Sequence, residues 1–382
     1  MGRALYVLPR AQRRGAAMTS TRLAAQLRGE WEPLVVTLFT GGDPSVLGAA
    51  VPIRQLEVRA GLGRRVLGVS PAAVRALRAA ALEFRPDLLV AWGGEPLLHA
   101  APVARRAGAR LLYVKISPTQ PKLVRGLRRI VFRRALARAD WLVAVTVELA
   151  EELRRDLGVR RPVAVAHNFR LPTDRPSPGD RASFRAELGV GDDVVLAAFA
   201  GSLSRDKGPD QALEALALAT GNVHLAVAGA GPLEGALRER AARPDLAGRV
   251  HLLGSRGDVP RILAGADLVL LSSREEGRPG VLLEAALAGR PAVAFAEGGV
   301  AALVDDGVEG VLVAPGDVAA LGRALSALAA DPARRQAMGS AAARRGDGYL
   351  APAALPAWRE AFRAATAGRR SSAPRSSEPG PG

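Results

Sequence analysis

The chain alternates between short apolar runs and longer segments in which apolar residues recur at helical spacing. A short apolar run bounded by turn residues is typical of a strand buried on both faces of a parallel sheet. Strands are predicted in the first half at 4–8, 34–39, 87–92, 110–114, 141–145 and 163–166. In the second half they are predicted at 194–200, 223–228, 250–253, 266–271, 291–295 and 310–313. With helical patterns between them, as at 16–28, 71–84 and 122–138, these strands predict an α/β fold of two doubly wound, Rossmann-like domains.

A change in composition separates the two series of strands. The Pro-rich polar stretch RLPTDRPSPGD lies in a linker predicted at 170–190, between an N-terminal domain of residues 1–169 and a C-terminal domain of residues 191–348. A C-terminal helix at 349–366 is expected to return to the first domain, and a tail at 367–382 is expected to be disordered. We expect the two domains to face each other across a cleft at the carboxyl ends of their strands.

The segment REEGRPGVLLEAALAGRP contains two glutamates, Glu276 and Glu284, eight residues apart. Glu276 follows a predicted strand, and Glu284 lies in a helix predicted at 279–288 between a proline and a glycine. Because this helix is apolar on every side, it carries Glu284 into surroundings where an unpaired carboxylate is costly. Two kinds of partner remain open at this point, an arginine in a structural ion pair and a ligand that bears hydroxyl groups.

Three glycine-containing turns follow predicted strands of the second half: AGSLSRDKG, AGAGPLEGAL and EGGVAALVDDG. Glycine lets the backbone approach a ligand closely, and free N–H groups at a helix N-terminus bind phosphate. A tight connection between strand and helix explains any single turn equally well. Several such turns at one edge of a sheet favour a nucleotide diphosphate.

The order of GSLSRDKG, AGAGPL, HLLGSRGDVP, ADLVLLSSREEGRPGVLLEAALAGRPAVAF, GG and DGVEGVLVAPGD resembles the donor domain of family-4 glycosyltransferases, the "glycosyl transferase group 1" type with GT-B fold. The first half resembles that family more loosely, through PDLLVAWGGEPLL, RRALARADWLVAVTVEL and VAVAHNF. The resemblance implies a transferase that moves a sugar from a nucleotide-diphospho-sugar to an acceptor with retention at the anomeric carbon. It also implies that no metal or other cofactor is needed.

The resemblance also implies roles for individual residues. Carried over by position, Glu276 would bind donor-sugar hydroxyls and Glu284 the ribose diol, while Lys207 and backbone amides would hold the diphosphate. The expected catalytic residues are Glu276, Lys207 and Arg205. The expected donor-binding residues are Gly201, Ser202, Gly229, Gly231, Arg256, Gly277, Gly280, Val281 and Glu284. The residues expected on the acceptor side are Gly15, Arg14 and Lys115.

The chain departs from the family pattern at several positions. Ser202 stands where the family usually has arginine, Ala302 stands where it usually has glutamate, and the histidine that often follows the strand at 110–114 is absent. Arg205 either supplies the missing charge or is a solvent-exposed arginine, and Lys115 either orients a phosphate or is a surface lysine at a strand end. Two alternatives therefore stay open beside the transferase, a GT-B sugar-nucleotide epimerase and a non-catalytic nucleotide-sugar-binding protein.

The net charge of +16 lies in the first half, because residues 1–180 hold 30 of the 53 basic residues and 14 of the 37 acidic ones. This asymmetry favours an anionic or lipid-linked acceptor. The segment 122–138 has seven basic residues and no acidic one. It is either a membrane-surface helix or a solvated basic face over an apolar stripe packed on the sheet.

Composition also limits the other partners and the location. Aromatic residues make up only 4% of the chain and no recognition motif appears, so a nucleic-acid partner is not expected. No apolar run has the length of a membrane span, and the absence of cysteine fits a reducing compartment. The expected location is the cytoplasm, with peripheral contact at the inner face of the membrane.

Overall fold

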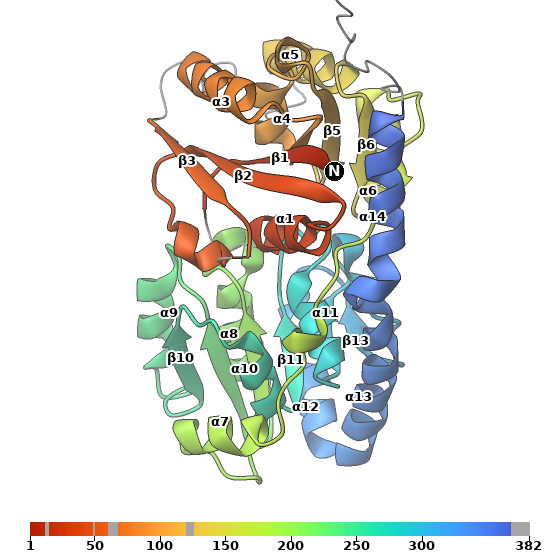
Figure 1. Ribbon diagram of the computed structural model, residues 1–382. Coiled ribbons are helices and arrows are strands. Elements are labelled where there is room, and N and C mark those ends of the chain that lie inside the picture. The colour runs from red at the N-terminus through yellow and green to blue at the C-terminus, as the bar shows by residue number, and fades with distance from the viewer. Residues whose placement is uncertain (12–14, 49, 60–67, 120–125, 368–382) are drawn as a thin grey trace, which may run out of the picture. The chain divides into compact units, whose positions relative to one another are not determined.

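The computed structural model describes residues 1–11, 15–48, 50–59, 68–119 and 126–367 (Figure 1). They form two compact units: unit 1 contains residues 1–166 and the residues from 356 on, and unit 2 contains residues 167–355. Each unit has a parallel sheet wrapped by helices, so the predicted class of two Rossmann-like domains is confirmed. Within the described residues, no helix is long and apolar enough to cross a membrane.

Unit 1 contains a seven-stranded parallel sheet in the order β3-β2-β1-β4-β5-β6-β7. Its strands are β1 (Gly2–Leu8), β2 (Trp31–Phe39), β3 (Ile53–Val58), β4 (Leu88–Trp92), β5 (Arg110–Lys115), β6 (Trp141–Ala144) and β7 (Ala164–Val165). Its helices include α1 (Gly15–Gln26), α3 (Pro71–Phe84), α4 (Gly94–Ala100), α5 (Gly126–Ala137) and α6 (Val147–Leu157), with short 3₁₀ turns η1 (Pro44–Leu47) and η2 (Arg105–Ala107). The sequence did not predict β3, an edge strand whose residues IRQLEV have polar positions between the apolar ones and therefore form no continuous apolar run.

Aromatic side chains join the sheet of unit 1 to helices on both of its faces. Tyr113 of β5 lies edge-on to Phe132 of α5. On the opposite face, Trp92 of β4 stacks on Trp358, with ring centroids 5.3 Å apart. Trp358 belongs to α14 (Ala351–Thr366), which begins in unit 2 and contributes its residues from Pro356 on to unit 1. The expected disordered tail lies outside the described residues, apart from Ala367.

Unit 2 contains a six-stranded parallel sheet in the order β10-β9-β8-β11-β12-β13. Its strands are β8 (Val195–Ala200), β9 (Val223–Ala228), β10 (Val250–Gly254), β11 (Leu268–Leu271), β12 (Ala292–Phe295) and β13 (Gly310–Val313). Its helices include α7 (Asp180–Leu188), α8 (Pro209–Leu218), α9 (Glu234–Ala241), α10 (Val259–Gly265), α11 (Gly280–Leu287), α12 (Val318–Ala330) and α13 (Pro332–Gly346). Short 3₁₀ turns are η4 (Pro172–Asp174), η5 (Arg205–Lys207), η6 (Gly298–Val300) and η7 (Asp347–Tyr349).

Alternate residues of the unit 2 strands enter two separate cores. Phe199 and Leu270 pack with α8, α12 and α13 on one face, whereas Leu196 and Val269 pack with α7, α10 and α11 on the other. The strand order reverses between β8 and β11. In open α/β sheets the carboxyl edge at such a reversal is where ligands bind.

The segment at 170–190, predicted as a linker, lies within unit 2. It contains η4 and α7, and Phe184 of α7 is fully buried in one of the two cores. At its beginning the backbone of Arg170 is fixed, because Arg170 N donates to Tyr349 O at 2.8 Å and Ala351 N donates to Arg170 O at 2.8 Å. The polar residues of this segment therefore lie on the surface of a packed part of unit 2.

Candidate functional site

The loops that follow β8 and β9 pack backbone against backbone. A Cβ atom on Gly229 would lie 1.8 Å from the carbonyl oxygen of Gly201, and one on Gly231 would lie 2.5 Å from that of Leu203. Gly201 N also donates to Ala228 O at 2.9 Å. Loop packing is thus a sufficient reason for the glycines at 229 and 231, and their predicted contact with a donor stays a prediction.

A second pair of loops, after β11 and β12, has the same kind of contact. A Cβ atom on Gly298 would lie 1.9 Å from the carbonyl oxygen of Glu276, and one on Gly299 would lie 1.8 Å from that of Gly277. Only residues without a side chain allow this approach. The glycines of η6 therefore fix the turn in which Glu276 lies.

Polar contacts join the β8 loop to the β11 loop across the reversal point. Ser272 Oγ donates to Gly208 O at 2.7 Å, and Arg274 N donates to Asp206 O at 2.8 Å. The Arg274 guanidinium binds both carboxylate oxygens of Asp210, at 2.9 and 2.7 Å, and holds the pKa of that carboxyl below its usual value. No local sequence pattern indicates a role for Arg274, because its partners lie more than 60 residues away.

Lys207 and Glu276, both predicted site residues, meet at this point. Lys207 Nζ lies 2.9 Å from Glu276 Oε1, which also accepts from Ser273 Oγ at 2.7 Å. Glu276 is buried, and Lys207 is partly exposed. Among the described residues, Glu276 Oε2 has no hydrogen-bond partner, so one carboxylate oxygen is left for a ligand.

Helix α11 begins at Gly280 directly after this turn. Its N-cap, Pro279, provides no side-chain hydrogen bond, and within the described residues the N–H groups of Gly280 and Val281 have no acceptor. The free N–H groups and the helix dipole favour an anion at this end. Glu284 is one turn further along the helix, and its side chain is 21% exposed although its neighbours Leu283 and Ala285 are buried.

Glu284 forms an ion pair with Arg170, a residue that no sequence pattern indicated. Arg170 Nε donates to Glu284 Oε1 at 2.9 Å, and Nη1 donates to Phe169 O at 3.1 Å. The arginine partner left open by the sequence is therefore present. Glu284 Oε2 has no hydrogen-bond partner in the described part of the chain, so a hydroxyl-bearing ligand can still bind to it.

Three other predicted site residues have no side-chain hydrogen bond to Lys207, Glu276 or Glu284 within the described residues. Arg256 forms a bidentate pair with Asp258, at 2.8 and 2.7 Å, and a further bond with Glu187 at 2.6 Å. Both acids raise the pKa of Arg256 above its ordinary value. Arg205 is exposed, and Ser202 is half-buried. Neither of these two side chains has a hydrogen bond within the described residues.

The residues predicted on the acceptor side belong to unit 1. Arg14 lies outside the described residues, and Gly15 is the first residue of α1. Lys115 is not a surface lysine: it is buried at the end of β5, where Nζ lies 2.9 Å from Glu152 Oε1 and donates to Thr119 Oγ1. Burial lowers the pKa of Lys115, although the Glu152 carboxylate opposes this shift.

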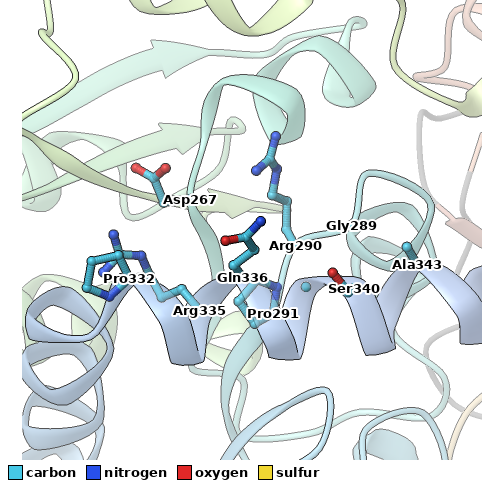
Figure 2. Close-up of a pocket in the computed structure, with 10 residues that line it drawn as sticks. Asp267, Gly289, Arg290, Pro291, Pro332, Arg335, Gln336, Ser340 and Ala343 are labelled. Carbon is cyan, nitrogen blue, oxygen red and sulfur yellow. The ribbon is translucent and has the colours of Figure 1, made fainter.

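A pocket of about 320 Å³ lies at the opposite, amino-terminal edge of the unit 2 sheet (Figure 2). Its lining includes Asp267 before β11, Arg290 before β12 and Arg335 of α13. Arg290 donates to the carbonyls of Leu263 and Ala264, and Arg335 to carbonyls at the end of α12. Because these guanidinium groups cap helix C-termini, we assign the pocket a structural origin. No cluster of three or more metal-binding side chains occurs among the described residues.

Comparison with known proteins shows the family of the chain. Residues 180–345 match the family described as Glycosyl transferases group 1, and residues 13–170 match Glycosyltransferase Family 4. The D-inositol 3-phosphate glycosyltransferase of Streptomyces avermitilis is 33% identical over 298 residues, which are 72% of this chain and 62% of that protein. The GDP-mannose-dependent alpha-(1-6)-phosphatidylinositol monomannoside mannosyltransferase of Mycolicibacterium smegmatis is 33% identical over 279 residues, covering 67% of this chain and 71% of that protein. The chain thus spans less than two thirds of the first relative.

Solved structures show the fold. Anabaena HepE in complex with UDP and glucose has a TM-score of 0.83 at 22% identity, and the match covers 96% of this chain and all of the other. The sucrose-phosphate synthase of Thermosynechococcus elongatus has a TM-score of 0.80 at 18% identity, with 97% of this chain covered. Both structures share the two Rossmann-like domains described above. From its sequence matches and its fold, this chain is a member of glycosyltransferase family 4 with the GT-B fold.

Proposed function

We propose that this protein is a glycosyltransferase that moves a sugar from a nucleotide-diphospho-sugar to an acceptor, with retention at the anomeric carbon and without a metal ion. One observation carries the proposal. At the reversal point of the unit 2 sheet, Glu276 and Glu284 flank an uncapped helix N-terminus, and each keeps one carboxylate oxygen without a partner among the described residues.

Each carboxylate has a ligand group to which it is suited. Glu276 Oε2 would accept hydrogen bonds from hydroxyls of the donor sugar, and Glu284 Oε2 would accept from the ribose diol. Hydrogen bonds to a charged acceptor contribute about 1.5–3 kcal/mol each. Because each Oε1 is already held by a cation, at 2.9 Å in both cases, the carboxylates are oriented before the ligand arrives.

The diphosphate would lie at the start of α11. The N–H groups of Gly280 and Val281 and the ammonium of Lys207 provide positive charge there. Negative charge grows on the diphosphate as the glycosidic bond breaks, and fixed donors aimed at that charge lower the barrier. These groups take the place that a metal ion would have, so activity should survive a chelator.

Binding and product analysis test the proposal. Thermal unfolding with UDP, GDP and ADP and with their sugar conjugates identifies the base, since a bound ligand raises Tm. Incubation of the preferred donor with an acceptor panel, followed by NMR of the new anomeric centre, tests transfer and retention. Inversion would contradict the proposed mechanism, and an isomerised nucleotide-sugar formed without acceptor would identify an epimerase instead.

We further propose a phosphorylated or lipid-linked acceptor. The names of two relatives specify an inositol phosphate and a phosphatidylinositol mannoside, and the excess positive charge of this chain lies in its first half. A phosphorylated acceptor would be attracted to such a surface. Transfer to inositol 3-phosphate should therefore exceed transfer to inositol, and equal rates would contradict a charged acceptor.

Helix α5 supports a peripheral contact with an anionic membrane at the cytoplasmic face. Phe132, Ala135 and Leu136 pack inward, but Leu127 and Ile130 are 60% and 48% exposed. The 12 residues of the helix carry four arginines and no acid. Basic residues near an anionic surface contribute about 1 kcal/mol each. Vesicles rich in phosphatidylserine should bind the protein at low salt. The double variant Leu127→Ser with Ile130→Ser should bind them more weakly. Failure of the wild type to bind at low salt would exclude this contact.

A non-catalytic nucleotide-sugar-binding protein is the second candidate. The ion pair between Arg170 and Glu284 favours it, since part of the predicted ribose-binding carboxylate already has a partner. This candidate predicts donor binding with neither transfer nor slow donor hydrolysis over a broad acceptor panel. Detection of either reaction, abolished by Glu276→Ala, would reject it.

A further inference from the structure

Arg170 is held more rigidly than a surface arginine, by both its backbone and its side chain. Its N–H and carbonyl pair with Tyr349 and Ala351, and only 5% of the residue is exposed. Its Nε and Nη1 atoms donate to Glu284 Oε1 and Phe169 O. Within the described residues the remaining nitrogen, Nη2, has no hydrogen-bond acceptor. The guanidinium therefore keeps one nitrogen donor, Nη2, unused in a fixed position.

The Nη2 atom lies against the first residue of α11. A Cβ atom on Gly280 would lie only 2.3 Å from Arg170 Nη2, so the glycine makes room for the guanidinium rather than for a turn with positive φ. Any side chain at this position would displace Arg170. Position 280 thus has glycine, which disfavours a helix, and this allows the Arg170 guanidinium to lie beside the free N–H groups of α11.

This placement is unfavourable for the free protein. A helix N-terminus is the positive end of the dipole, which destabilises a nearby cation. Glu284 offsets part of this repulsion through its bond to Nε, and Nη2 has no acceptor within the described residues. Local conflicts with stability of this kind are expected at functional sites. An anion at the start of α11 would remove the conflict, because it would attract Arg170 and the helix dipole together.

The other basic residues predicted for the site leave room for a further cation at the diphosphate. Lys207 is shared with Glu276, Arg256 binds two acids, and the position after Gly201 is the neutral Ser202. Arg205 is exposed and is not held in place by a side-chain hydrogen bond within the described residues. We propose that Arg170 is itself a donor-binding residue, which holds Glu284 through Nε and binds the diphosphate through Nη2. This rests on the proposed function and adds to it a residue that couples the ribose contact to the phosphate contact.

Isothermal titration calorimetry of three probes tests the proposal: the nucleoside and the nucleoside diphosphate of the preferred base, and inorganic pyrophosphate. Arg170→Met should weaken the binding of nucleoside diphosphate and of pyrophosphate by about 10- to 100-fold, the equivalent of one or two charge-assisted hydrogen bonds. The affinity for the nucleoside should change by less than about threefold, since Glu284 keeps its free oxygen. Arg170→Lys keeps the charge and should restore part of the pyrophosphate affinity.

Arg290→Met is the matched control, since it removes another guanidinium from unit 2, whose hydrogen bonds within the described residues all go to backbone carbonyls at the opposite sheet edge. It should lower Tm and leave all three affinities unchanged. Equal losses of nucleoside and diphosphate in Arg170→Met would show that Arg170 acts only through Glu284. No loss of diphosphate would also overturn the proposal, while the proposed function would stand on the wild-type titrations. If the wild type binds none of the probes, the proposed function fails, and this proposal with it.

Discussion

Each unit has a lysine–glutamate pair at the carboxyl end of its sheet, and the two pairs differ in which partner is buried. The Nζ–Oε1 distance is 2.9 Å both between Lys115 and Glu152 in unit 1 and between Lys207 and Glu276 in unit 2. In unit 1 the lysine side chain is 2% exposed and the glutamate 13%. In unit 2 the lysine side chain is 31% exposed and the glutamate 6%.

The surroundings of the pairs explain what this difference means. Around Lys115, Thr119 contributes both its hydroxyl oxygen as acceptor for Nζ and its backbone N–H, which donates to Glu152 at 2.8 Å, so the buried cation is enclosed. Around Glu276, the buried carboxylate keeps Oε2 unpaired within the described residues and its lysine reaches solvent. We infer that the first pair holds unit 1 together and the second is arranged to meet a ligand.

Lys207→Met gives the largest expected effect. It removes a charge that we propose stabilises the departing diphosphate, and loss of such a group lowers kcat by about 100-fold or more. Donor affinity should fall more for the nucleoside diphosphate than for the nucleoside. A fall in Tm is also expected, because the buried carboxylate of Glu276 loses its cation and keeps Ser273 Oγ as a donor. Steady-state kinetics and calorimetry measure both; a large fall in Tm with equal loss of both ligands would make this pair structural too.

Lys115→Met is the reciprocal test in unit 1. Breaking a buried ion pair by removing one partner costs about 3 kcal/mol of unfolding free energy, because the other charge stays behind. Urea unfolding should detect this loss, while affinity for nucleotide diphosphate should be that of the wild type. Weaker nucleotide binding at unchanged stability would reverse our interpretation of the two pairs.

Glu284→Ala sharpens the comparison within unit 2, since its carboxylate is held by Arg170 rather than by a lysine. Loss of its proposed contacts with the ribose should weaken the binding of both nucleoside and nucleotide by about 10-fold or more. The fold should persist because the side chain is partly exposed. Unchanged nucleoside affinity with a clear drop in Tm would show that the ion pair with Arg170 is purely structural.

The smallest expected effect is a pH dependence of unit 1. Burial lowers the pKa of Lys115 below its ordinary value of 10.5, so the unfolded chain binds a proton that the folded chain lacks between the lowered pKa and 10.5. Unfolding free energy should therefore rise with pH across that interval and be independent of this group below the folded-state pKa. The difference in unfolding free energy between wild type and Lys115→Met, measured by urea unfolding up to pH 10.5, isolates this contribution. If that difference shrinks with rising pH, the ion pair with Glu152 has a larger effect on the pKa of Lys115 than burial has.

Much of the fold was contained in local sequence patterns. Buried strands produce apolar runs and covering helices produce helical periodicity, so twelve of the thirteen strands in the described residues were predicted to within a few residues. The exception, β3, is an edge strand that has only partly buried residues beside its exposed one, and an apolar run is the signal of burial on both faces. The sequence likewise determined that Glu276 follows a strand, that Glu284 lies in an apolar helix and that Lys207 precedes another helix.

Only the tertiary structure decided what these groups meet. Arg170 and Glu284 are 114 residues apart, Lys207 and Glu276 are 69 apart, and Lys115 and Glu152 are 37 apart. No periodicity links such positions, because they are brought together by strand order and loop packing rather than by the repeat of a helix or strand. The sequence showed on energetic grounds that Glu284 needs a partner. That the partner is Arg170 depends on the tertiary structure, which places the first residues of unit 2 beside α11.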